Sequence, residues 1–88
     1  MNTQVSYDSE ADVLYASICK PTQCTSREVG PCVLLRYDVM SGALCAITLV
    51  GARQHALADR ASITASIAPA PSALRRAVTA WIDAGAAR

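Results

Sequence analysis

Three carboxylates stand at alternate positions near the N-terminus, in the stretch VSYDSEADVLYASI. Asp8, Glu10 and Asp12 have the chemistry of an acid/base pair or of a cation site, and their D-x-E-x-D spacing resembles the opening of a calcium loop. That loop also needs a glycine at its sixth position and a bidentate glutamate at its twelfth. Val13 and Cys19 occupy these positions, so calcium binding is not expected.

Catalysis by paired carboxylates needs two acids whose environments separate their pKa values, usually within a cleft. A short exposed turn offers neither condition, and DSEAD has the composition of a turn between two strands. A second Tyr-Asp pair precedes a turn that ends at a conformationally permissive glycine. The pattern therefore predicts structural turn residues rather than a catalytic site: Asp8, Asp12, Asp38 and Gly42.

The four cysteines are Cys19, Cys24, Cys32 and Cys45. A zinc site usually presents its thiolates as closely spaced pairs, and these spacings are irregular. We interpret the cysteines as reduced, incidental thiols, with Cys45 facing the core, and zinc is the less favoured alternative. No cofactor and no metal are expected.

The single histidine, His55, has no evident nucleophile or orienting acid at a useful spacing, so a surface position is expected. Arg75 and Arg76 are consecutive on a predicted helix without interleaved aromatic residues, which is typical of a solvated face. No catalytic constellation emerges, and the chain is predicted not to be an enzyme.

Length and composition predict one small domain that builds a marginal core. The chain has 88 residues, 52% of them hydrophobic, but it has no Phe, and much of its apolar content is Ala. Such a shortfall is often met by pairing with another copy. The net charge is +1, and no run approaches the roughly 18 apolar residues of a membrane span. Because the N-terminus also lacks a signal-peptide pattern, a cytoplasmic location without membrane contact is expected.

Short β-branched and aromatic runs, separated by turn residues, predict an α+β fold: a small curved antiparallel sheet of four or five strands followed by a C-terminal helix. The expected organisation is an antiparallel β domain over residues 1–58 with a short helix at its end, a linker over 59–71, and an amphipathic helix over 72–85. Several strands carry apolar residues on both faces.

The C-terminal helix carries an apolar stripe at helical spacing, formed by Leu74, Val78, Trp81 and Ile82. It either covers the sheet of its own chain or packs against a second chain. This stripe is the predicted interaction surface, and tryptophan is a frequent anchor of protein interfaces.

Three motifs carry a resemblance to a known family: V-x-Y-D-x-E-A-D-x-L-Y, then REVGPCVLLRYD, then SGALCAITLVGA. They resemble the YuzE-like family of small uncharacterised bacterial proteins (domain of unknown function DUF2283), over about residues 4–52. The resemblance implies a compact antiparallel sheet with a helix after it and no established activity. Some relatives are suspected partners of small toxin-like proteins. One strand loses an acid that is usual in relatives, and the tail beyond Ala52 is an addition.

Together these patterns favour a non-enzymatic protein-binding module, antitoxin-like and homodimeric, with a small protein as a further partner. The alternative is a nucleic-acid-binding regulator that uses the basic C-terminal part, because residues 53–88 carry five Arg and two Asp. A small enzyme or zinc protein ranks third.

Overall fold

The computed structural model describes residues 3–19, 23–30 and 32–86, and within these the side chains of 56–58, 85 and 86 are not described. Strands come first and helices last. The elements are β1 (Gln4–Asp8), β2 (Val13–Ser17), β3 (Cys24–Glu28), β4 (Val33–Asp38), β5 (Leu44–Val50), α1 (Ala52–Ala58), α2 (Arg60–Ser66) and α3 (Ser72–Ala86).

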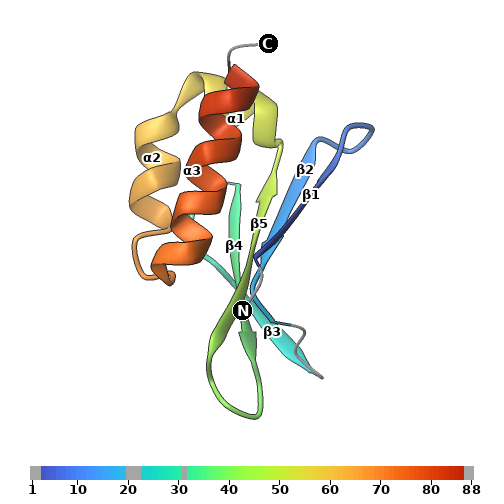
Figure 1. The fold of residues 1–88 in the computed structure, drawn as a ribbon, viewed down its shortest axis with the longest axis vertical. Helices are drawn as coiled ribbons and strands as arrows, with labels where there is room; N and C mark the ends of the chain where they lie inside the picture. Colours follow the sequence, from blue (N-terminus) through green and yellow to red (C-terminus); the bar gives the residue numbers. More distant parts are fainter. Residues whose placement is uncertain (1–2, 20–22, 31, 87–88) are drawn as a thin grey trace.

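The five strands form one antiparallel sheet in the order β1-β2-β5-β4-β3. Two hairpins, β1-β2 and β4-β5, lie side by side, and β3 completes the edge beside β4 (Figure 1). The α+β prediction is confirmed, with five strands in the sheet.

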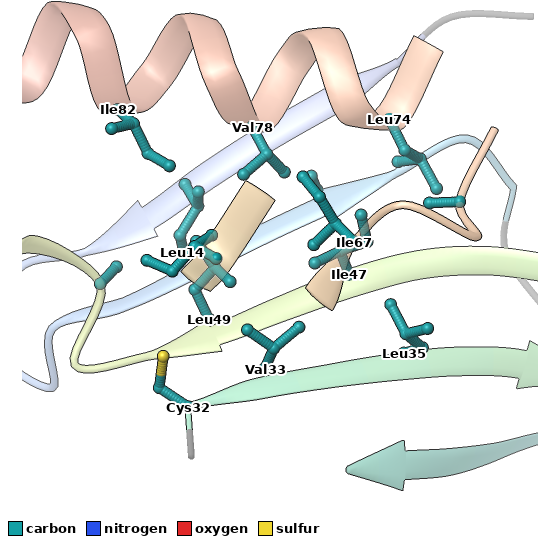
Figure 2. Close-up of a cluster of buried hydrophobic side chains, with 14 residues drawn as sticks. Leu14, Cys32, Val33, Leu35, Ile47, Leu49, Ile67, Leu74, Val78 and Ile82 are labelled. Atoms are coloured by element: carbon teal, nitrogen blue, oxygen red, sulfur yellow. The ribbon is translucent and has the colours of Figure 1, made fainter. Parts of the chain in front are cut away.

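The helices gather on one side of the sheet and enclose the core with it (Figure 1). Leu14 and Ala16 of β2 and Ile47 and Leu49 of β5 point to this side, because their alternation matches the strand period of two. Figure 2 shows these strands' side chains meeting those of α3. The other buried members of the cluster are Cys32, Val33, Leu35, Ala52, Ile63, Ile67, Ala70, Leu74, Val78 and Ile82.

Helix α3 covers the sheet of its own chain with the predicted apolar stripe. Leu74 and Val78 are fully buried and Ile82 is 2% exposed. Trp81 is partly buried, and its ring lies 4.9 Å from the ring of Tyr7 on β1. Of the two docking arrangements considered, the structure therefore has the intramolecular one.

The segment predicted as a linker over 59–71 needs correction, because it contains helix α2. The Asp59 side chain accepts a hydrogen bond from the Ser62 amide, which caps the helix at its start. Ile63 and Ile67 are buried in the core, and an ion pair from Arg60 to Asp83 (3.0 Å) ties α2 to α3. Burial of two isoleucines stabilises a helix that the Ala-rich sequence alone did not predict.

The prediction for Cys45 was also wrong in part. Arg36 of β4 pairs with Ala46, but the next residue, Tyr37, pairs with Leu44, so Cys45 is the extra residue of a bulge. Leu44 packs against the core cluster, whereas Cys45 is buried outside it and forms a disulfide with Cys19. Two of the four predicted reduced thiols are therefore bonded to each other.

In the part of the chain that the structure describes, no helix is both long enough and apolar enough to span a membrane.

Candidate functional site: the open face of the sheet

The side of the sheet away from the helices is the candidate binding surface, and we call it the open face. The strand register defines it, since paired residues on neighbouring strands point to the same side. Its members are Gln4, Ser6, Asp8, Val13, Tyr15, Ser17, Cys24, Ser26, Glu28, Leu34, Arg36, Asp38, Ala46, Thr48 and Val50.

Apolar residues occupy the centre of the open face and polar residues its edges. The three central strands contribute the apolar Val13, Tyr15, Leu34, Ala46 and Val50 together with Ser17, Arg36, Asp38 and Thr48, whereas β1 and β3 contribute Ser, Gln, Asp, Glu and Cys side chains. Tyr15 is 43% exposed and Val50, at the end of β5, is 47% exposed, although both belong to strands that are paired on both sides. An apolar centre inside a polar rim is the usual composition of a protein interface.

One end of the open face is hollowed by a pocket of about 340 Å³. Cys19, Cys24 and Arg36 line it together with Tyr15, Ala16, Ser17, Ala46, Ile47 and Thr48. The Arg36 Nη2 donates a hydrogen bond to Cys24 Sγ at 2.8 Å. This contact crosses from β4 to β3 and places a guanidinium beside the thiol of the edge strand.

The acids of the first hairpin have structural partners. Asp8 Oδ1 accepts hydrogen bonds from the amides of Glu10 (3.0 Å) and Ala11 (3.2 Å), as expected for a turn. Asp12 lies in the left-handed region, with φ at 55°. Glu10 is exposed.

Asp12 also caps a helix that begins 40 residues later in the chain. Its Oδ1 accepts from the Arg53 amide (2.9 Å) and from the Tyr7 hydroxyl (2.7 Å), and its Oδ2 accepts from the Gln54 amide (3.4 Å). Gly51, the residue at the start of α1, has no side chain to cap it. The carboxylate of Asp12 therefore satisfies amides that the local sequence leaves without a cap.

These bonds set the pKa of Asp12. Burial by itself raises this pKa, but the hydrogen bonds from the Arg53 amide, the Tyr7 hydroxyl and the Gln54 amide outweigh it and hold the pKa below its usual range. Because the folded state lowers the pKa, the ionised carboxylate stabilises the fold at neutral pH. That contribution is lost as the pH falls below about 4 and through the folded-state pKa.

We expect Asp12→Ala to destabilise the chain by about 2 kcal/mol, from the lost cap and the cost of alanine in a left-handed conformation. Asp12→Asn keeps an acceptor and tolerates that conformation, so it should cost less and should remove part of the acid sensitivity between pH 5 and pH 3 (roughly, from the usual Asp titration range). Urea unfolding across this pH range measures both effects. Glu10→Ala in the same turn is the control, and an equal loss in that variant would contradict the capping role.

The second turn uses the same chemistry. Asp38 accepts hydrogen bonds from the Ser41 hydroxyl (2.8 Å) and from the Ser41 and Met40 amides. The Ser41 hydroxyl bond is the main reason that the pKa of Asp38 is lowered. Gly42 has φ at 73°, a conformation that favours glycine, and its amide donates to the Asp38 carbonyl (2.7 Å).

The remaining candidates are dispersed. His55 is partly buried beside Gly51, and Cys32 lies in the core on the helix side. Among the described residues, no group of three or more His, Cys, Asp or Glu side chains is arranged to hold a metal ion. Arg75 and Arg76 line a groove of about 680 Å³ between α2 and α3, where the Arg75 Nε donates to the Ala70 carbonyl.

Two contacts were missed by sequence reasoning, one on the open face and one at the start of α1. The first is the contact of Arg36 with Cys24, which depends on the pairing of β3 with β4. The second is the capping of α1 by Asp12. The sequence held a partial signal for it, because neither Val50 nor Gly51, directly before α1, has a side chain that can cap a helix.

Comparison with family models matches residues 4–53 to the family described as "Protein of unknown function (DUF2283)". Neither the curated proteins nor the solved structures include a significant match. The matched segment contains the whole sheet and the start of α1.

Proposed function

We propose that this chain, which belongs to the DUF2283 family of proteins of unknown function, is a non-enzymatic binding module that self-associates through the open face. The family description assigns no activity, and the YuzE-like name and an antitoxin-like role remain predictions. The observation that supports self-association is the apolar centre of the open face, with Tyr15 and Val50 nearly half exposed.

The size of the open face suits a second copy of the chain. Five strands of about six residues span roughly 20 by 24 Å, so two such faces bury on the order of 1,000 Å² in total. This reaches the lower limit for a stable interface. A two-fold axis through the face would place the tyrosines of both copies near its centre and the polar edge strands at the rim.

The test is the oligomeric state of Tyr15→Arg. Light scattering on a chromatography peak should give twice the 9.2 kDa chain mass for the parent and a weakening of association by about 100-fold in the variant. Val5→Arg is the matched control, since Val5 is 44% exposed on the same hairpin but points to the helix side of the sheet.

Two outcomes contradict the proposal. If the parent chain is still a monomer at about 100 µM, the open face does not form a stable dimer interface. A control variant that loses association as strongly as Tyr15→Arg would indicate pairing along the β1 edge instead of the open face. Binding to a separate small protein is tested by co-expression with the neighbouring gene product, and stable co-purification would support it.

The nucleic-acid alternative depends on Arg75 and Arg76 beside the α2–α3 groove. It predicts binding whose affinity falls steeply with salt concentration. A flat titration with duplex DNA and with RNA at low salt would remove it.

A further inference from the structure

Three of the four cysteines lie at or next to the pocket at one end of the open face. Cys19 is bonded to Cys45, and the free thiol of Cys24 lines the same pocket of about 340 Å³ as Cys19. Cys24 follows Cys19 by five residues in the sequence. It belongs to β3, an edge strand that is separated from β2 by β5 and β4. A thiol and a disulfide that share a pocket are the two reactants of thiol–disulfide exchange.

The two sulfurs of the disulfide differ in access. Cys19 is exposed and lines the pocket, whereas Cys45 is 2% exposed at the bulge of β5. An attacking thiolate needs access to the sulfur that it attacks, and the other sulfur departs. The geometry therefore makes Cys19 the sulfur under attack and Cys45 the leaving group.

Arg36 distinguishes Cys24 from the other free thiol. Its guanidinium donates to Cys24 Sγ at 2.8 Å, and a neighbouring cation stabilises negative charge as it develops on sulfur. Cys32, in contrast, is buried in the core, and burial raises the pKa of its thiol. Reactivity is accordingly assigned to Cys24.

We propose that Cys24, Cys19 and Cys45 form a disulfide-exchange site that converts the Cys19–Cys45 bond into a Cys19–Cys24 bond. Cys24 Sγ loses its proton and bonds to Cys19 Sγ while the Cys19–Cys45 bond breaks. The electron pair stays on Cys45 Sγ, which takes up the proton. The numbers of disulfides and thiols are unchanged, so the step needs no oxidant or reductant.

The exchange changes which strands are tied together. In the structure the disulfide joins the end of β2 to β5, and after exchange it joins the end of β2 to β3. Cys45 then remains as a buried neutral thiol, which behaves as a small apolar side chain. The proposal does not rest on self-association, because all three cysteines belong to one chain and the exchange takes place within it, although Tyr15 also lines the pocket.

Peptide mapping of the oxidised full chain tests the step directly. Free thiols are blocked with iodoacetamide after incubation at pH 8, and the chain is digested with trypsin without reduction. Trypsin does not cut the Lys20-Pro21 bond, so Cys19 and Cys24 stay in peptide 1–27, while Cys32 is in 28–36 and Cys45 in 37–53. The starting bond links 1–27 to 37–53. The exchanged bond gives 1–27 alone, about 2 Da lighter than its dithiol form because it has two fewer hydrogen atoms, and peptide 37–53 with Cys45 blocked.

We expect the exchanged form to appear as a minor but detectable species in the parent and in Cys32→Ser, because its shorter loop is stabilised less, and to be absent in Cys24→Ser. Arg36→Gln should slow its appearance on the order of tenfold, and Arg36→Lys should restore much of the rate. Failure of the parent to form the exchanged bond, or dependence of its rate on protein concentration, would overturn the proposal. A separate variant tests whether Cys24 can reach Cys19. When Cys45→Ser is oxidised it must form the Cys19–Cys24 bond, and failure to do so would also overturn the proposal.

Discussion

Replacing Val78 with Asp is expected to unfold the chain at room temperature. Val78 is fully buried between α3 and the strands, as Figure 2 shows, and the substitution would place an unpaired carboxylate in this apolar cluster. The lost burial and the desolvated charge together cost more than about 4 kcal/mol. A domain of this size has little more than that in total. Circular dichroism during heating and urea titration measures the loss.

Ala80→Asp is the matched control, because Ala80 lies two residues further on the same helix and is exposed. It introduces the same charge at an exposed position, where the main cost is the lower helix propensity of Asp compared with Ala, and should change stability by no more than about 1 kcal/mol. If Val78→Asp keeps a cooperative transition at a similar urea concentration, then α3 does not cover the core as the structure shows.

Removing the disulfide is the second large effect. The double variant Cys19→Ser/Cys45→Ser should lose about 3.5 kcal/mol, the loop-closure value for a sequence separation of 26 residues. The same loss should follow when the parent is reduced, whereas the variant should not respond to reductant. Cys24→Ser is the control, since it removes a thiol that is not in the disulfide. Equal stability of the oxidised and reduced parent would contradict a structural role for this bond.

The sheet could be predicted because its strands follow simple alternation. Leu14, Ala16, Ile47 and Leu49 stand at every second position, and the Asp8 and Asp38 turns have the side chains that bond turn amides. The apolar character of both faces was also visible in the sequence. Strand alternation does not determine which of the two faces α3 covers. The docking of α3 decides this, and it leaves Tyr15 exposed on the other face.

The errors have physical causes. Cys45 was assigned to the core by counting every second residue, but the bulge opposite Arg36 and Tyr37 shifts that count by one. Helix α2 was missed because its sequence, RASITAS, has Ile63 as its only large apolar residue and shows no apolar stripe, and its stability comes from tertiary burial. The bonds from Asp12 to α1 span more than 40 residues, beyond the reach of any local pattern.

Of the candidate functional residues, those in the turns could be predicted and those at the pocket could not. Asp8, Asp12, Asp38 and Gly42 were expected as turn residues, and the structure gives each of them hydrogen bonds or a positive φ in a turn. The meeting of Cys24 with Arg36 was not predictable, because it requires the register of β3 on β4 in addition to the residue types.

The burial of α3 has a consequence for the family as a whole. The matched segment, residues 4–53, carries the apolar inner surface of the sheet but not the helix that shields it, since α3 begins at Ser72. A relative that shares only this segment has the same apolar sheet surface but lacks the helix that covers it here, so another element must cover it. The regions after the sheet should therefore be free to diverge in sequence and in shape across the family, provided that each supplies an apolar stripe to the same surface.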